Sequence, residues 1–384
     1  MDDIYKKALE LHRKHRGKLD LFVKIPLKTK EDLSLLYTPG VAEASRAIQK
    51  NPEEIWELTS RGNWIAVVTD GSSVLGLGDI GAESSLPVME GKCAIFKEFG
   101  GLAAFPIALQ TRDIDIFVET VKQISLSFGA INLEDIAAPR CFEIEERLKK
   151  ELPIPVMHDD QHATAVVVVA GLINALKLTG RTIESAAITV SGAGAAGTAI
   201  LKLLNLVGAK NIIAVDKDGI LHAKRNDLDE WRKELLEFTN LENKEGSLTD
   251  ALVGRDVLIG VSAPNIVSEE MVRNMAKDPI VFALANPTPE IMPDVAQKAG
   301  AAVVATGRSD FPNQINNALV FPGFFKGVLE AEAREITDEM KRAAAYALAE
   351  HVQNPSPEAV LPDMFDQGVV DTIARAVARA SKRA

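Results

Sequence analysis

Two adjacent aspartates lie between two histidines in the segment PVMHDDQHATA (155–165), directly before a long apolar run. Asp159 and Asp160 therefore place two negative charges where the chain is about to enter a hydrophobic core. In the simplest interpretation one of them caps a helix that begins near Ala163, because aspartate is a favoured N-cap residue. One carboxylate is sufficient for a cap, however, and two side by side repel each other. A bound cation would account for both.

A second acidic pair, Glu134 and Asp135, lies upstream in INLEDIAAPRCFEIE. Carboxylates also suit the start of a helix, so this pair has a purely structural interpretation as well. If the two pairs converge, their oxygens form a site for a hard divalent ion such as Mg²⁺ or Mn²⁺. His158 and His162 have the i, i+4 spacing of the zinc-hydrolase HExxH helix. An aspartate follows the first histidine and a nucleotide-binding pattern comes next, so zinc is the less favoured ion.

A glycine-rich loop, VSGAGAAGTAI, follows a strand-like run and opens a helical one. The loop residues are Gly192, Ala193, Gly194, Ala195, Ala196 and Gly197, and the glycines have GxGxxG spacing. This context predicts a dinucleotide site with the pyrophosphate at the helix N-terminus. Asp216 ends the next strand, where it would accept hydrogen bonds from both ribose hydroxyls and repel a 2′-phosphate. That favours NAD over NADP, although the adjacent Lys217 softens the repulsion.

Two more strand ends border the same crevice, in GVSAPN (260–265) and LANPTPE (284–290). Ligands of open α/β sheets bind beyond the carboxyl ends of the strands, so Asn286 is a candidate ligand of the nicotinamide half of the cofactor. The alternative is an Asn-Pro turn, which needs no ligand.

Tyr37, in LLYTPGV, and Lys92, in MEGKCAIF, are candidates for proton transfer. Either residue alone is usually structural or solvated. Near a metal and in an apolar pocket, however, the pKa of a lysine falls, which makes Lys92 a plausible general base.

The elements that must position these residues are strands and helices that alternate along the chain. Strand-like runs (WIAVVTD, GLAAFPIAL, IPVMHDD) are separated by helical patterns, and from Ala187 onward strands and helices alternate regularly. This alternation predicts a parallel, doubly wound sheet. We therefore expect an α/β protein of two domains. A smaller α/β substrate and metal domain would span 1–160, and a Rossmann-type domain with C-terminal helices would span 161–384.

Length and composition exclude several classes of protein. With 384 residues and a net charge of −11, the chain fits two globular domains and lacks the basic character that nucleic-acid binding needs. Cys93 and Cys141 have no CxxC spacing, which argues against a disulfide framework or a thiolate zinc site. No apolar run approaches the roughly 20 residues that cross a bilayer, and the charged N-terminus predicts a short helix rather than a signal peptide. A cytoplasmic protein without a membrane partner is expected.

Taken in order, these residues resemble a malic enzyme of the short prokaryotic form. The resemblance runs from about Leu33 to Gly327 and rests on SLLYTPGVA, DGSSVLGLGDIG, VMEGK, INLEDI, HDDQH, SGAGAAG, ALANPTPEI and ATGRSDFPNQINNALVFPG. It implies a homodimeric enzyme that oxidatively decarboxylates L-malate to pyruvate and CO₂, reduces NAD or NADP, and requires Mg²⁺ or Mn²⁺.

The resemblance also implies a role for individual residues. The implied metal ligands are Glu134, Asp135 and Asp160. The implied proton-transfer residues are Tyr37 as general acid, Lys92 as general base in contact with substrate, and Asp159 as the partner of Lys92. The implied ligands of the cofactor and of the substrate carboxylate are Asn286, Asn316 and Asn317.

Two departures from the family pattern bear on substrate binding. Ala163 stands where the family usually has glycine. The arginine that long eukaryotic forms place between DG and LGLGD is replaced by the run 72–74, which leaves Arg308 as a weaker candidate for the C1 carboxylate. The alternatives to a malic enzyme are another NAD-linked dehydrogenase, acting on a 2-hydroxy acid or an amino acid without a metal, and a non-catalytic NAD sensor. A sensor would have no use for Tyr37, Lys92 and the carboxylates.

Overall fold

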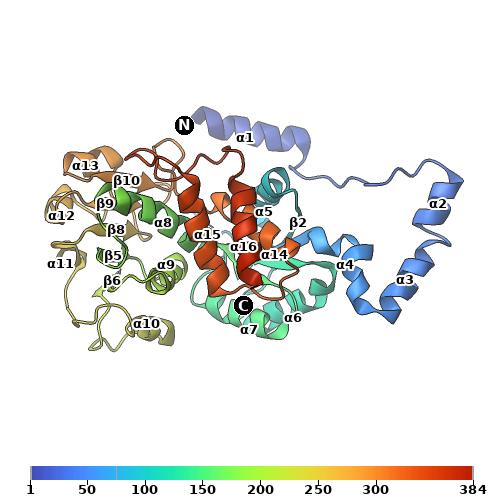
Figure 1. The fold of residues 1–384 in the computed structure, drawn as a ribbon, viewed down its shortest axis with the longest axis horizontal. Coiled ribbons are helices and arrows are strands. Elements are labelled where there is room, and N and C mark those ends of the chain that lie inside the picture. The colour runs from blue at the N-terminus through green and yellow to red at the C-terminus, as the bar shows by residue number, and fades with distance from the viewer. Residues whose placement is uncertain (1, 75, 383–384) are drawn as a thin grey trace.

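Two sheets organise the chain, whose computed structural model describes residues 2–74 and 76–382 (Figure 1). Among these residues, the first sheet has four strands in the order β2-β1-β3-β4, and the second has six in the order β10-β9-β8-β5-β6-β7. The strands are β1 Trp64–Thr69, β2 Ala103–Ala108, β3 Ala130–Leu133, β4 Val156–His158, β5 Ala187–Ser191, β6 Asn211–Asp216, β7 Gly219–Ile220, β8 Val257–Gly260, β9 Ile280–Ala283 and β10 Val303–Thr306. The expected α/β class is confirmed.

Helices cover both sheets. They are α1 Asp2–His15, α2 Lys30–Leu36, α3 Val41–Lys50, α4 Ile55–Leu58, α5 Gly81–Gly100, α6 Ile114–Ile124, α7 Arg140–Glu151, α8 Asp159–Leu178, α9 Ala195–Leu206, α10 Glu230–Leu235, α11 Leu248–Leu252, α12 Glu269–Arg273, α13 Pro293–Lys298, α14 Phe321–Glu330, α15 Asp338–His351 and α16 Val369–Ser381. Short 3₁₀ turns lie at η1 Pro52–Glu54, η2 Ser60–Asn63, η3 Ser125–Ser127 and η4 Asn317–Leu319. The expected N-terminal helix is α1, and the expected helical C-terminal segment contains α15 and α16.

The register of the first sheet brings the two acidic pairs to one edge. β3 and β4 are parallel neighbours, with Leu133 opposite His158. Glu134 directly follows β3 and Asp159 directly follows β4, so both residues lie at the same carboxyl end of the sheet. The second acidic residue of each pair, Asp135 or Asp160, comes next in the chain. The strands are short and buried because helices cover the faces of a parallel sheet, which is why they read as continuous apolar runs.

The second sheet has the strand order of a dinucleotide-binding fold. β5 lies between β6 and β8, and both pairings are parallel, so successive strands move to opposite sides of β5. The crevice that this reversal creates beyond the carboxyl ends is the usual ligand position. The strand ends expected in GVSAPN and LANPTPE are confirmed as the ends of β8 and β9. β7 is an unexpected two-residue edge strand, antiparallel to β6.

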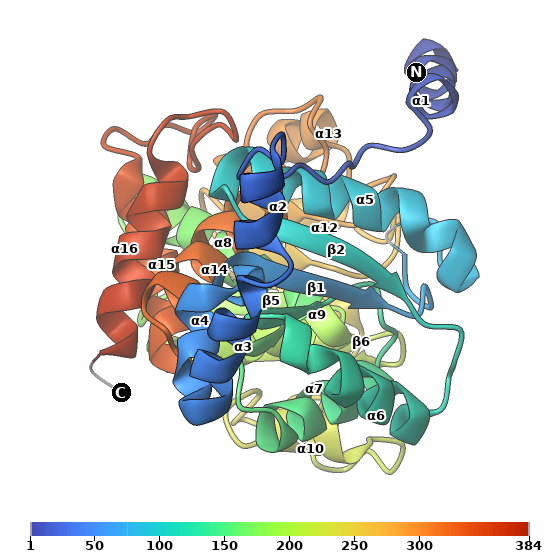
Figure 2. The ribbon, with the colours of Figure 1, turned by 90° about the vertical axis from the view of Figure 1, so that its right-hand side faces the viewer.

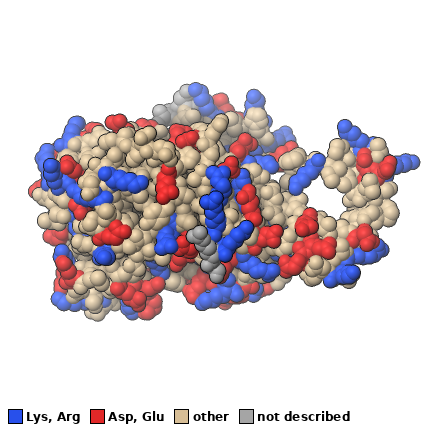
Figure 3. All heavy atoms as spheres, in the orientation of Figure 1, with Lys and Arg blue, Asp and Glu red and all other residues tan. Residues whose placement is uncertain are grey.

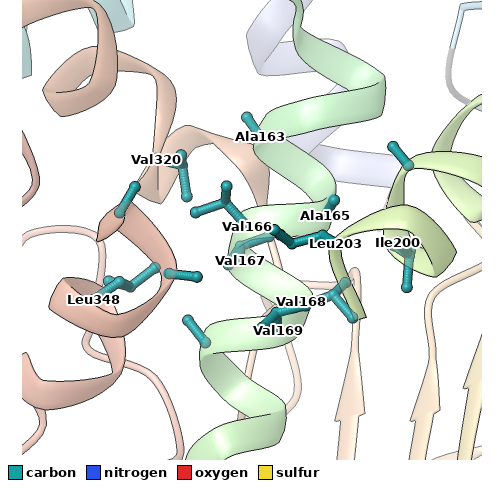
Figure 4. Packing of buried hydrophobic residues seen from close by; sticks show 14 of the residues in the cluster. Ala163, Ala165, Val166, Val167, Val168, Val169, Ile200, Leu203, Val320 and Leu348 are labelled. Carbon is teal, nitrogen blue, oxygen red and sulfur yellow. The ribbon is translucent and has the colours of Figure 1, made fainter. Parts of the chain in front are cut away.

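α8 begins at Asp159, four positions earlier than the helix expected at Ala163. The residue in the N-cap position is His158, whose side chain caps nothing, so the expectation that an aspartate caps this helix is wrong. α8 packs against α9, α15 and η4, and its small and β-branched side chains, such as Val166, Val167 and Ala165, belong to this packing (Figure 4). Within the described chain, α8 is the one helix long and apolar enough to span a membrane, and most of it is buried inside the molecule.

The C-terminal helices join the two sheets into one core. α14 packs against α5 and α16, and α15 packs against α8 and α16 (Figure 2). The ring of Phe96 on α5 lies 4.6 Å from that of Phe321 on α14, measured between centroids. A single hydrophobic cluster therefore runs from the first sheet into the second. The division into domains at 160/161 stays a prediction, with the two sheets lying on either side of it.

Residues 17–58 project from this body and are called the arm below (Figure 1). No residue of the arm is buried, and α2 and α3 bury no side chain at all. Its exposed large apolar side chains are Leu19, Leu21, Phe22, Val23, Ile25, Leu27, Leu33, Leu35, Leu36, Tyr37, Val41 and Leu58. Between the arm and the body is an open, largely apolar hollow of about 1030 Å³, visible as a gap in the space-filling view (Figure 3).

Candidate active site

The two acidic pairs meet beyond the ends of β3 and β4. Carboxylate oxygens of Glu134, Asp159 and Asp160 all lie within 4.8 Å of one another. The backbone N–H of Asp135 donates to Asp160 Oδ2 at 2.9 Å, which ties the second pair to the first. Glu134, Asp135 and Asp159 are buried, whereas the Asp160 side chain is 30% exposed. Asp160 is therefore the member of the cluster that faces an open approach.

Lys92 lies on α5 and extends into this cluster. Its Nζ is 2.6 Å from Asp159 Oδ2 and 2.7 Å from Glu134 Oε1. The ammonium group also lies 4.3 Å from the centroid of the Phe321 ring. The side chain is only 8% exposed, so one lysine from the first sheet's helix layer reaches carboxylates that follow two different strands.

The electrostatics of Lys92 differ from the expectation. Burial by itself lowers the Lys92 pKa, as the sequence suggested, but the charges of Asp159 and Glu134 outweigh it and hold the pKa above its usual value. The expected fall in the Lys92 pKa is therefore wrong for the protein without a bound ion. Burial raises the pKa of Glu134 and of Asp159, and the neighbouring carboxylates raise both further.

The residues at this cluster fit a divalent cation. All its donors are carboxylate oxygens, which Mg²⁺ and Mn²⁺ prefer. Asp159 Oδ1 is buried without a hydrogen-bond partner within the described residues, and Asn132 Nδ2 orients Glu134 by donating to Oε2 at 2.9 Å. Three crowded carboxylates around one lysine leave negative charge that a cation would compensate. Asn132, two residues before Glu134, was missed because a single buried asparagine gives no sequence signal.

Asn317 joins the same cluster, and Asn316 does not. Asn317 Nδ2 donates to Asp159 Oδ2 at 2.6 Å, so this residue lies beside the proton-transfer pair. Asn316 Oδ1 accepts from the backbone N–H of Ala318 and caps η4. Its side chain also lines a separate cavity next to Phe365. Contact of Asn316 and Asn317 with the substrate stays a prediction for both residues.

Tyr37 lies outside the cluster of its own chain. It is the residue after α2, on the arm, and its side chain is 66% exposed. Within the described residues its side chain makes no hydrogen bond to Lys92 or to the carboxylates. The role of Tyr37 as a general acid stays a prediction, and one chain alone does not assemble it.

The glycine loop has the geometry of a phosphate cradle. Gly192 follows β5 with φ +109°, and a Cβ there would lie 2.6 Å from the Val261 carbonyl oxygen. A Cβ on Gly197 would lie 1.6 Å from the carbonyl oxygen of Gly192, so helix and loop pack too closely for any side chain. Gly194, in the N-cap position of α9, has open space around it and no side-chain cap. Free N–H groups thus face an open approach, as a pyrophosphate requires.

Glu290 fixes the two loops beyond β8 and β9 and was missed by the sequence analysis. The side chain is fully buried and accepts from the backbone N–H of Ser262 at 2.9 Å and of Ala285 at 3.0 Å. Asn286, the expected cofactor ligand, is half-buried in the loop that Glu290 holds. A lone acidic residue inside LANPTPEI, a segment predicted to be a strand end, gives no sign by itself that it is buried between two loops.

The two remaining candidate ligands, His162 and Arg308, already contact carboxylates of their own chain. The Nε2 atom of His162 is 2.9 Å from Glu145 Oε2, and burial lowers the His162 pKa to about 3. His162 therefore serves a helix contact between α7 and α8, which disfavours the zinc interpretation. Arg308, the weaker candidate for the substrate carboxylate, pairs with Asp310 at 2.6 Å.

A Rossmann-type sheet with a glycine loop, next to a lysine held by carboxylates, defines a nicotinamide-dependent oxidoreductase with a cation site. Comparison with known families agrees: residues 161–382 match the family model described as the NAD binding domain of malic enzyme, and residues 16–149 match the malic enzyme N-terminal domain. The chain belongs to the malic enzyme family.

Individual relatives resemble the chain along nearly its full length. It is 53% identical to the bifunctional malic/malolactic enzyme of Bacillus subtilis, over 98% of this chain and 92% of that protein. It is 45% identical to the NADP-dependent malic enzyme of Halomonas elongata, over 92% and 84% of the two chains. The crystal structure of a malic enzyme from Pyrococcus horikoshii superposes with a TM-score of 0.96 at 48% identity and covers 99% of this chain and 91% of that one.

Proposed function

We propose that this chain oxidises L-malate with NAD or NADP and decarboxylates the product to pyruvate and CO₂, in the presence of Mg²⁺ or Mn²⁺. Membership of the malic enzyme family supports the reaction. The observation that carries the proposal is the position of Lys92, buried and within 2.7 Å of both Asp159 and Glu134 at the edge of a carboxylate cluster. An NAD sensor would not need this arrangement.

Glu134, Asp135 and Asp160 are proposed as the ligands of the divalent ion. When bound, such an ion activates the malate hydroxyl and stabilises negative charge as CO₂ leaves. The converging carboxylate oxygens of Glu134 and Asp160 support two of these ligands. Asp135 is proposed from the family resemblance, and its backbone N–H contact with Asp160 places it beside them. Asp159 also has an oxygen in the cluster, so the choice between Asp159 and Asp160 as ligand is open to a direct test.

Lys92 is proposed to accept the proton of the malate hydroxyl as hydride leaves C2 for the nicotinamide. Because two carboxylates keep Lys92 protonated, it must first lose a proton, and Asp159 at 2.6 Å is the acceptor within reach. A cation bound to Glu134 would offset one of the three carboxylate charges that raise the Lys92 pKa. Asn317 donates to the same Asp159 oxygen and holds the pair in place.

Loss of the C4 carboxylate as CO₂ leaves an electron pair at C3, which must receive a proton to give pyruvate. Tyr37 is the proposed donor. Its exposure on the arm is compatible with that role if the arm of one chain reaches the cluster of a second copy. The exposed apolar side chains of the arm and the hollow beside it support such an exchange, because a lone chain would leave this surface in water.

The proposal therefore includes a homodimer with two-fold symmetry, in which each arm completes the other chain's site. It also includes a cytoplasmic location. Cys93 and Cys141 are both free and buried, which suits a reducing compartment.

The test is malate-dependent reduction of NAD and NADP, followed by the absorbance of the reduced nicotinamide with and without Mn²⁺, with pyruvate measured as product. We expect metal-dependent reduction with one pyruvate formed for each nicotinamide reduced. Reduction without Mn²⁺, or without release of CO₂, would instead indicate a simple 2-hydroxy-acid dehydrogenase.

A further inference from the structure

Asp216 and Arg225 form a bidentate ion pair next to the glycine loop. Arg225 Nη1 donates to Asp216 Oδ1 at 2.7 Å, and Nη2 donates to Oδ2 at 2.9 Å. Both side chains are about nine-tenths buried. The pair adjoins the loop because β6 ends beside β5, where the backbone N–H of Gly192 donates to the Val215 carbonyl at 2.7 Å. The carboxylate expected to be free for the ribose is therefore already engaged.

The hydrogen-bonding capacity of Asp216 is nearly used. Oδ1 also accepts from the backbone N–H of Asp218 at 2.9 Å. A carboxylate offers about four lone-pair sites, and three donors occupy them here, so roughly one remains. That is enough for one ribose hydroxyl. The expectation that Asp216 accepts from both ribose hydroxyls stays a prediction, and this count favours one of the two.

Arg225 is shared between two carboxylates. Its Nε donates to Asp227 Oδ1 at 3.0 Å, and its Nη2 contacts the second oxygen of the same side chain. Asp218 Oδ2 lies 3.8 Å from Nη2. Arg225 thus supplies one positive charge to three carboxylates, of which Asp218 and Asp227 are about half exposed. A second guanidinium, that of Arg232, lies at the edge of this group: its Nε is 3.8 Å from Asp216 Oδ2, and its Nη1 pairs with Asp229 at 2.8 Å.

This arrangement discriminates between the two nicotinamide cofactors. A 2′-phosphate can reach the guanidinium only by displacing a carboxylate, which then lies unpaired beside the phosphate. A 2′-hydroxyl needs only the free acceptor position on Asp216. In other dinucleotide folds an arginine at this place receives the 2′-phosphate of NADP. Here the arginine is present but occupied.

We propose that Arg225 is a specificity-determining residue: paired with Asp216 it enforces preference for NAD, and released from Asp216 it binds the 2′-phosphate of NADP. The inference rests on the proposed function only in that the glycine loop binds a nicotinamide dinucleotide. Asp216→Ser alone should then change the cofactor preference, without any added positive charge.

The experiment measures binding of NADH and NADPH to the purified protein by fluorescence titration, without malate or metal. The variants are Asp216→Ser, the double variant Asp216→Ser with Arg225→Gln, and Asp218→Ser as a control that removes one charge but keeps the ion pair. Losing or gaining hydrogen bonds to a charged group corresponds to roughly ten- to hundredfold in affinity. We expect Asp216→Ser to weaken NADH binding and strengthen NADPH binding, each about tenfold or more.

The double variant decides the role of Arg225. If Arg225 binds the phosphate, adding Arg225→Gln abolishes the gain in NADPH affinity, and Asp218→Ser shows only a small gain. Equal NADPH affinity in the single and double variants would overturn the proposal, as would an equal gain in Asp218→Ser. Asp216→Asn, which keeps the shape of the side chain, replaces Asp216→Ser if thermal unfolding shows that the serine variant is misfolded. Because malate turnover is not measured, failure of the proposed reaction would leave this result interpretable.

Discussion

At the scale of single residues, the central feature is an ammonium group held by two carboxylates in a buried site. Lys92 lies 2.6 Å from Asp159 and 2.7 Å from Glu134, and Asn317 donates to the same oxygen of Asp159 that Lys92 contacts. Such a group transfers protons only when its neighbours change charge. Lys92 and Asp159 therefore act as a unit, and the loss of either should have a similar effect on the chemical step.

Lys92→Ala should lower malate oxidation by about 10²- to 10⁴-fold, the usual contribution of a general base. NADH binding should be unchanged, because the glycine loop belongs to the other sheet. Lys97→Ala is the matched control, since Lys97 is an exposed residue of the same helix α5. Turnover in Lys92→Ala close to that of the control would contradict the assignment.

Asp159→Asn and Asp160→Asn should separate proton transfer from metal binding. We expect Asp160→Asn to abolish tight Mn²⁺ binding in calorimetric titration, because it removes a charged ligand at the open side of the cluster. Asp159→Asn should retain Mn²⁺ binding and lose turnover. The reverse pattern would assign the metal to Asp159, whose oxygen lies in the same cluster.

At the scale of elements, strand register and helix starts determine the site. β3 and β4 end in register, and α8 starts immediately after β4, so its first turn carries both aspartates. On the second sheet, Glu290 performs a similar task for two loops by accepting from the N–H groups of Ser262 and Ala285. A buried acceptor that joins two loops stabilises both, because either N–H would otherwise lack a partner.

Glu290→Gln should destabilise the protein by about 1–3 kcal/mol, since one of the two backbone N–H groups would face an amide NH₂ in place of an acceptor. We also expect a higher KM for the dinucleotide, because Asn286 lies in the loop that Glu290 holds. Urea denaturation and cofactor titration measure the two effects. Glu270→Gln, at an exposed position of α12, should change neither quantity.

At the scale of the whole molecule, the arm is the part with few contacts to the rest of its own chain: Lys18 bonds to Glu90, and Trp56 packs against the core. Its residues 17–58 bury no side chain, carry many exposed apolar groups and end beside a hollow of about 1030 Å³. Tyr37 is on this arm, whereas Lys92 is in the body. A second copy that supplies Tyr37 would cover the apolar surface and complete the site at once.

Complementation between two inactive variants tests this arrangement. Tyr37→Phe and Lys92→Ala should each be nearly inactive alone. After subunit exchange of an equal mixture, a two-fold dimer with exchanged arms places one intact Tyr37–Lys92 pair in each hybrid, so roughly a quarter of wild-type activity should return. No recovery, with hybrids verified by differently tagged chains, would mean that Tyr37 acts within its own chain or takes no part.

Much of this protein could be predicted from local sequence. Alternating periodicities indicated the parallel sheets, GxGxxG after a strand indicated the dinucleotide loop, and two acidic pairs indicated a cation, because each pattern reflects a backbone or charge requirement that operates over a few residues. The resemblance to malic enzymes added Asp159 and Lys92 as partners.

Tertiary structure decided which of these groups meet. Register between β3 and β4 joined the acidic pairs. The charges of the neighbouring carboxylates outweighed the effect of burial and reversed the expected shift of the Lys92 pKa. Asn132, Arg225 and Glu290 were invisible in the sequence, since a single polar residue has meaning only through the buried partner that it faces. Tyr37 lies on the exposed arm in the single chain, and the side chain of Asn316 caps η4, whereas its neighbour Asn317 bonds to Asp159. Distances between segments far apart in the chain depend on packing, which local residue patterns do not encode.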